Sequence, residues 1–189
     1  LVIYKQCLSF LILILLIVIL QMINMKHQYK FRMKKIGFEV AGSYSIYDED
    51  NKLLGKSLGY SIKKRYINYT SYLNNNAYII SKRPLGYFLL MKDEQVEAII
   101  KFNWFSSSFI IKCSDDMDYH MTYNSLDSTH KIHLNGKNLG VISASNWMRN
   151  DVVISLSDLQ DVDYIFAGAI AYGYAENIPS LRYFLKSNA

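Results

Sequence analysis

The stretch YIFAGAIAYGYA, residues 164–175, carries no charge on any face and contains Gly168, Gly173 and four alanines. A helix that is apolar all round must be buried on every side or lie in lipid. Twelve residues are too few to span a bilayer core, which needs about 20. Small residues keep such a helix thin, so that surrounding strands can approach it closely. The sequence therefore predicts a hydrophobic helix enclosed by a barrel of strands.

The helix is predicted to span residues 158–175. Ser157 stands before it and is a suitable N-cap, because its hydroxyl can accept a hydrogen bond from the first turn. Asp158, Asp161 and Asp163 would then lie near the positive end of the helix dipole.

Short strand patterns separated by turn signals fill most of the chain before this helix. Asn135-Gly136 is the strongest signal, because a type I′ hairpin turn requires positive φ at both central positions. No alternation of strands with helices appears, which argues against a parallel nucleotide-binding sheet. We expect about twelve strands in an antiparallel barrel or sandwich, with strand segments at 43–47, 52–56, 65–72, 77–81, 87–91, 96–102, 108–112, 119–123, 130–134, 139–143 and 151–156.

An apolar segment at residues 7–25 includes the uncharged run LSFLILILLIVIL at 8–20. Its length just suffices for a helix that crosses a bilayer, so we predict a membrane anchor. A secretory signal peptide is one alternative, although no small-residue cleavage site follows the run. The other alternative is a true start at Met22 or Met25, in which case the protein would be cytoplasmic.

Basic residues orient the predicted anchor. Lys5 alone precedes the apolar run, whereas five cations follow it closely: Lys26, Lys30, Arg32, Lys34 and Lys35. The positive-inside bias then places everything after the anchor in the cytoplasm. We expect three parts: an anchor at residues 1–25, a barrel with its helix at 26–176, and a tail at 177–189.

Many short strands followed by a buried C-terminal helix resemble the tubby C-terminal-like superfamily, which includes tubby, the phospholipid scramblases and the LURP-one-related proteins. The segments that carry the likeness, besides the helix, are IYDEDNKLLGK at 46–56, NWFSSSFIIK at 103–112 and HLNGKNLGVI at 133–142. The resemblance implies a closed β-barrel of about twelve strands around the helix. It also implies recognition of phosphoinositide or another membrane lipid. The cysteine cluster and the acidic calcium segment of scramblases have no counterpart here, so the resemblance carries over no functional residue.

Signals for chemistry are weak. His130 and His133 are three residues apart on one strand and should face opposite ways, so they would not chelate a metal together. Cys113 has no nucleophile signature around it and is predicted to be a buried strand residue. Asp115, Asp116 and Asp118 lack the spacing of a calcium loop. We therefore expect no enzyme, no metal and no cofactor, with an enzyme that uses Cys113 as the weakest alternative.

Charge is unevenly distributed along the chain. Residues 26–83 contain 12 Lys or Arg and 4 Asp or Glu, whereas residues 84–189 contain 8 and 12. The basic part follows the predicted anchor, and the cytoplasmic leaflet is anionic. We therefore predict that anionic lipid headgroups, or another amphiphile, are bound by Lys63, Lys64, Arg65, Lys82 and Arg83.

Two other interpretations of this charge remain. The first is that it only solvates strand edges, and the domain is a structural or protein-interaction module with a protein partner. The second is nucleic acid, since cations interleaved with tyrosines suit phosphates and bases. The acidic C-terminal part argues against nucleic acid, so we expect a non-catalytic, membrane-associated domain.

Overall fold

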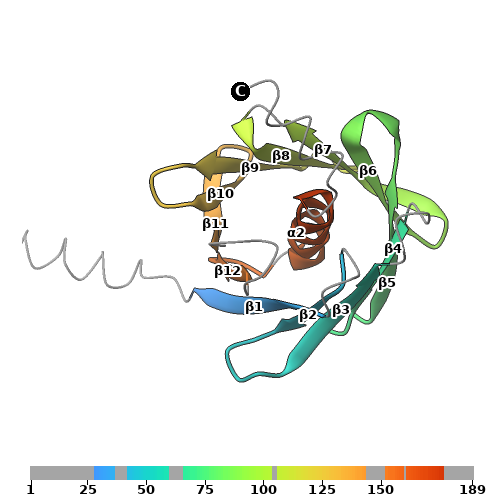
Figure 1. Ribbon diagram of the computed structural model, residues 1–189, viewed down its shortest axis with the longest axis horizontal. Coiled ribbons are helices and arrows are strands. Elements are labelled where there is room, and N and C mark those ends of the chain that lie inside the picture. Colours follow the sequence, from blue (N-terminus) through green and yellow to red (C-terminus); the bar gives the residue numbers. More distant parts are fainter. Residues whose placement is uncertain are drawn as a thin grey trace, which may run out of the picture.

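The computed structural model describes residues 28–36, 42–59, 66–103, 106–143, 152–159 and 161–176. They form twelve antiparallel strands closed into one barrel, in which each strand pairs with its neighbours in the chain (Figure 1). The strands are β1 (Tyr29–Lys35), β2 (Tyr44–Tyr47), β3 (Leu53–Gly59), β4 (Tyr66–Ser71), β5 (Asn76–Lys82), β6 (Tyr87–Lys92), β7 (Gln95–Asn103), β8 (Ser108–Cys113), β9 (Asp118–Asn124), β10 (Thr129–Leu134), β11 (Lys137–Ser143) and β12 (Val152–Leu156). A short 3₁₀-helix, η1 (Pro84–Gly86), joins β5 to β6. The expected barrel of about twelve strands is confirmed.

Strand β1 closes the ring, and it is not among the strands predicted from the sequence. Its residues pair with β12 on one side and with β2 on the other, for example Met33 with both Val152 and Ile46. Phe31 and Met33 are buried inside the barrel, while the residues between them face outward. This alternation has the period of a strand, but the basic residues within it were interpreted as the flank of an anchor.

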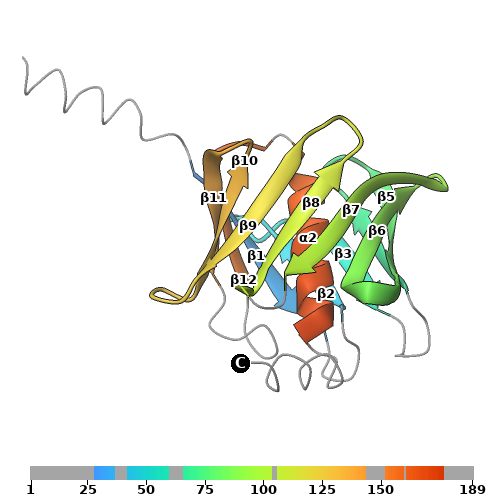
Figure 2. The same ribbon diagram turned by 90° about the horizontal axis from the view of Figure 1, so that it is seen from above.

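Helix α2 (Val162–Glu176) runs through the middle of the barrel, as Figures 1 and 2 show. Most side chains along it are buried, from Val162 to Ala175. A Cβ atom built on Gly168 would lie 2.6 Å from Ile111 Cδ1 and 2.9 Å from Phe109 Cε2. The helix is therefore enclosed by strands, and the absence of a side chain at Gly168 lets β8 approach it.

The helix begins later than predicted. The expected start at residue 158 is wrong, because α2 starts at Val162. Asp161 has a φ of +56°, in the left-handed region, and a right-handed helix cannot continue back through it. Asp163 remains in the first turn, as expected.

The two ends of the barrel differ. The N-end is where α2 begins, and the turns β2–β3, β4–β5, β6–β7, β8–β9 and β10–β11 lie there. Asn74 of the β4–β5 turn accordingly reaches Asp163. The C-end is where α2 ends; Gly42, just before β2, lies against Tyr174 there. Because the strands alternate in direction, β1 begins at the N-end.

The β10–β11 turn has the predicted form. Asn135 and Gly136 have φ values of +49° and +82°, which is the conformation of a type I′ turn.

The predicted anchor at residues 7–25 and the tail at 177–189 lie outside the described residues. Among the residues that are described, no helix is both long and apolar enough to cross a bilayer.

Candidate functional site

The predicted lipid-binding residues are described only in part. Lys63, Lys64 and Arg65 lie outside the described residues, in the chain between β3 and β4. Lys82 ends β5 and Arg83 follows it, so both are at the C-end, where Arg83 is exposed and Lys82 half-buried. We call this end of the barrel its mouth.

The mouth at the C-end holds further polar groups. Strand alternation places Lys35 and Lys82 on the inner face of the barrel, beyond the buried residues of β1 and β5. Burial lowers the pKa of Lys35. Tyr44, the strand partner of Lys35, is fully buried, and its hydroxyl has no hydrogen-bond partner among the described residues. The mouth thus presents two cations, and the Tyr44 hydroxyl is buried inside the barrel.

Acidic residues gather at the opposite end of the barrel. Twelve of the 16 acidic residues lie in the turns, strand ends and first helical turn at the N-end, against five lysines (30, 52, 92, 112 and 137). The twelve are Asp48, Glu49, Asp50, Asp93, Glu94, Glu97, Asp115, Asp116, Asp118, Asp158, Asp161 and Asp163. At the C-end, the described charges are Lys34, Lys35, Lys82, Arg83 and Lys101 with Asp127. The barrel is therefore polarised along its axis, which the division of charge along the sequence did not reveal.

Asp163 is the most buried carboxylate of the N-end. It is 3% exposed and accepts hydrogen bonds from the Tyr69 hydroxyl at 3.0 Å, the Tyr78 hydroxyl at 3.3 Å and the Asn74 side-chain amide at 3.0 Å. Burial and this carboxylate raise the pKa of Tyr78 to about 12 and that of Tyr69 further. Three neutral donors and the helix N-terminus thus hold the negative charge of Asp163.

Two more tyrosines extend this arrangement. Tyr119 donates to Asp161 at 3.0 Å, and Tyr164 donates to Glu97 at 3.3 Å. Burial, followed by the neighbouring carboxylate, raises the pKa of both tyrosines. In the sequence, the many tyrosines indicated only strands. The spacing of these tyrosines and carboxylates along the chain does not show that their side chains bond to each other.

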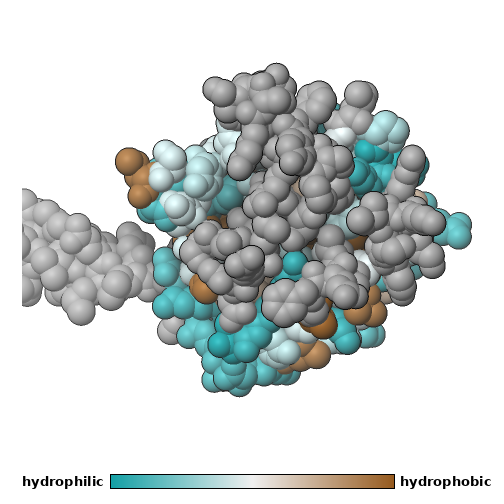
Figure 3. All heavy atoms as spheres, in the orientation of Figure 1, coloured by the Kyte–Doolittle hydropathy of each residue, from teal (hydrophilic) through white to brown (hydrophobic). Residues whose placement is uncertain are grey.

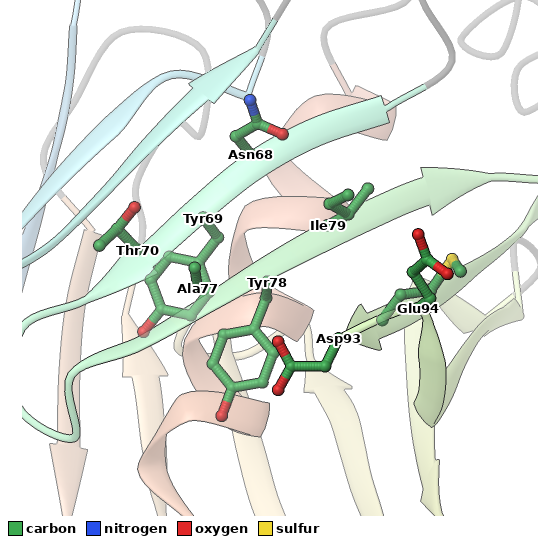
Figure 4. Close-up of a pocket in the computed structure, with 9 residues that line it drawn as sticks. Asn68, Tyr69, Thr70, Ala77, Tyr78, Ile79, Asp93 and Glu94 are labelled. Carbon is green, nitrogen blue, oxygen red and sulfur yellow. The ribbon is translucent and has the colours of Figure 1, made fainter.

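A hollow of about 460 Å³ opens in the barrel wall near this network (Figure 4). It lies over β4 and β5, beside the β6–β7 turn, and Figure 4 shows Asp93 next to the Tyr78 ring. Its lining residues are Asn68, Tyr69, Thr70, Ala77, Tyr78, Ile79, Met91, Asp93 and Glu94. It is the candidate small-molecule site of the described residues.

Cys113 is a poor candidate nucleophile. It is half-buried at the end of β8, and burial together with nearby carboxylates, led by Asp115, raises the pKa of its thiol to about 12. A reactive cysteine needs the opposite shift, since the thiolate is the nucleophile.

His130 and His133 face opposite ways on their strand, as predicted. His130 is 2% exposed inside the barrel, whereas His133 lies on the other face of β10 beside His120 of β9. No group of three or more potential metal ligands occurs among the described residues. Asp115 and Asp116 are exposed in the β8–β9 turn, and Asp118 forms an ion pair with Lys112 at 3.2 Å.

Comparisons with known proteins give a likeness of fold. No protein-family model and no curated protein matches the chain. The structure is similar to the X-ray structure of the Arabidopsis thaliana protein AT5G01750, with a TM-score of 0.56 and 8% sequence identity. The match covers 78% of this chain and 90% of the Arabidopsis chain. At this identity, the likeness shows that the two proteins share a fold and nothing about their activities.

Proposed function

We propose that this protein is a non-catalytic barrel of the tubby-like kind that recognises anionic lipid headgroups with its C-end. The order of strands and enclosed helix supports the tubby-like assignment, and so does the likeness to the Arabidopsis barrel. The observation that carries the lipid proposal is the axial separation of charge. An anionic surface attracts the C-end and repels the N-end, so the molecule approaches with the mouth first.

The contacts at the mouth suit a headgroup. Lys35, Lys82 and Arg83 would lie near the lipid phosphates, and each cation held near an anionic leaflet contributes about 1 kcal/mol. Three such cations give weak binding, which salt of about 1 M would abolish because it shortens the Debye length to about 3 Å.

Co-sedimentation with vesicles tests the proposal. The protein without residues 1–25 retains all described strands and α2, and we expect it to sediment with vesicles that contain anionic lipid but not with neutral ones. The double variant Lys82→Glu and Arg83→Glu should lose most of the binding. A control with the same change of charge, Lys131→Glu and Lys137→Glu, alters exposed cations outside the mouth and should bind as the wild type does.

Equal binding to neutral vesicles, or equal losses in both double variants, would contradict recognition at the mouth. Single-stranded DNA tests the nucleic-acid interpretation. When it is added to the protein together with anionic vesicles, it should not reduce the amount of protein that sediments with them.

A structural or protein-interaction module is the second candidate. The observation in its favour is a row of adjacent outward positions, Leu58, Asn68, Ile79 and Met91, across β3 to β6. Leu58 is 42% and Ile79 45% exposed, and Figure 3, which views the barrel end-on, shows hydrophobic patches among hydrophilic surface. If Leu58→Ser and Ile79→Ser abolish association with a partner while vesicle binding is unchanged, this candidate replaces lipid recognition.

A further inference from the structure

We propose that the hollow in the barrel wall beside the β6–β7 turn binds an alkylammonium group, supplied by a free polyamine or by a lysine side chain. This site lies at the N-end and is independent of the lipid proposal, which concerns anions at the other end.

The hollow exists because two strands separate. β5 pairs with β4 over six residues but with β6 over only four, from Ile79 with Met91 to Lys82 with Phe88. The pairing of β6 with β7 shifts its register between Leu90 and Met91, and Asp93 and Glu94 form the tight turn that follows. Beyond Met91, the β6–β7 hairpin no longer pairs with β5. Ala77 and Tyr78 of β5 therefore pair with β4 on one side and border the hollow, instead of β6, on the other.

The charges around the hollow favour a cation. Asp93 and Glu94 are exposed on its rim, and its nine lining residues include no Lys, Arg or His. Asp163 and Glu97 lie beneath, close enough to Tyr78 for both to contribute to raising its pKa. Tyr69 and Tyr78, which line the hollow, both donate to Asp163, so a carboxylate lies behind these two residues as well as on the rim. An anionic ligand would be repelled from both sides.

The remaining lining favours an organic cation over a metal ion. Ile79, Ala77 and Met91 present apolar surface that suits an alkyl chain. The buried rings of Tyr69 and Tyr78, which stack with centroids 5.6 Å apart and an interplanar angle of 13°, add aromatic surface behind these apolar side chains. A divalent metal instead requires several converging oxygen ligands, and no such group was found among the described residues.

The size of the hollow is also suitable. About 460 Å³ falls in the range of small-molecule sites. A flexible chain with an ammonium end can therefore place its methylene groups on Ile79 and its charge at the carboxylates of Asp93 and Glu94, which are labelled in Figure 4.

Calorimetric titration of the full chain in mild detergent tests the proposal, with spermidine as the first probe. A short peptide that contains one lysine and blocked termini is the second probe. Preferential binding of spermidine assigns the site to a free polyamine, and preferential binding of the peptide assigns it to a protein side chain. MgCl₂ at equal charge serves as the comparison and should compete poorly, because it cannot use the apolar surface.

The variants separate the hollow from the general acidity of the N-end. Asp93→Asn with Glu94→Gln should weaken binding about tenfold or more, and asparagine tolerates the positive φ of Asp93. Asp115→Asn with Asp116→Asn removes the same charge from another exposed turn of the N-end and should change affinity less than threefold. Ile79→Ser should weaken spermidine binding without changing the affinity for Mg²⁺.

Equal losses in the two acidic pairs would overturn the proposal, and so would full competition by Mg²⁺ or no binding of either probe. An unchanged melting temperature of each variant verifies that it is folded.

Discussion

Gly168 shows how closely α2 and the barrel wall approach each other. Leucine at this position would place its side chain into Ile111 and Phe109, which are fully buried and cannot move into solvent. We expect Gly168→Leu to lower the free energy of unfolding by about 1–3 kcal/mol or more, the usual cost of overpacking. Urea denaturation measures the change, with Leu126→Ala as a control, because Leu126 is 94% exposed. A variant as stable as the wild type would contradict the enclosed helix.

His130 makes stability depend on pH. Its ring is buried against Phe109, Tyr123 and Tyr172, and its Nε2 atom donates a hydrogen bond to the Ser107 carbonyl at 2.9 Å. Burial lowers the pKa of His130, and the hydrogen bond opposes this shift only in part. The folded protein therefore keeps the ring neutral at pH values where the unfolded chain, with a histidine pKa of about 6.5, binds a proton.

The sign of the effect follows from this difference. The contribution of His130 to stability is complete above pH of about 6.5 and is lost as the pH falls below it, by at most about 1.4 kcal/mol per pH unit. His130→Gln keeps a donor for Ser107 but does not titrate. Denaturation between pH 5 and pH 8 should therefore show a shallower acid loss in the variant. Parallel curves for the two proteins would contradict the prediction.

At the scale of elements, the first turn of α2 is held by the β4–β5 hairpin through Asp163. In Asp163→Asn, the side-chain amide would have one acceptor oxygen for three donors, and its own NH₂ group would face Tyr78 or Asn74. We expect a loss of about 1–3 kcal/mol, the cost of leaving buried polar groups without partners. Asp116→Asn, in an exposed turn, is the control and should be neutral. The melting temperature by circular dichroism compares the two, and equal values would mean that the network does not stabilise the helix.

The strands were predictable where hydrophobic alternation ended in a recognisable turn. The hairpin around Asn135 and Gly136 was found in this way, but the register shift between Ile132 and His133 was not predicted. β1 was not predicted because its outward residues, Lys30, Arg32 and Lys34, were interpreted as the basic flank of an anchor. The alternation with the buried Phe31 and Met33 was therefore overlooked. The start of α2 was misplaced because the left-handed conformation of Asp161 has no local signature.

The candidate sites were less predictable than the fold. The Tyr–carboxylate network joins residues as far apart as Tyr69 and Asp163, which only the closure of the barrel brings together. The hollow at Asp93 depends on where β5 leaves β6, and a pairing register is not visible in either strand alone. Lys82 and Arg83 were identified from charge, but their position at the mouth required the alternating direction of the strands.

At the scale of the whole molecule, the prediction from the sequence is that residues 7–25 hold the protein in a membrane and that the barrel lies in the cytoplasm. Fractionation of cells that express the chain should recover it with membranes after an alkaline wash. In sealed vesicles that keep the cytoplasmic side of the membrane inside, added protease should leave the barrel intact. Digestion of the barrel would place it on the other side of the membrane. A mature chain that begins near Met25 and is recovered in the soluble fraction would disprove the anchor.

The direction of β1 has a consequence for this arrangement. The chain enters the barrel at the N-end, beside the acidic turns, whereas Lys35, Lys82 and Arg83 lie at the C-end. If the preceding residues fix the protein in one bilayer, the basic mouth is directed away from that bilayer. Any anionic surface that the mouth then met would belong to a second membrane, and the barrel would stand between two bilayers.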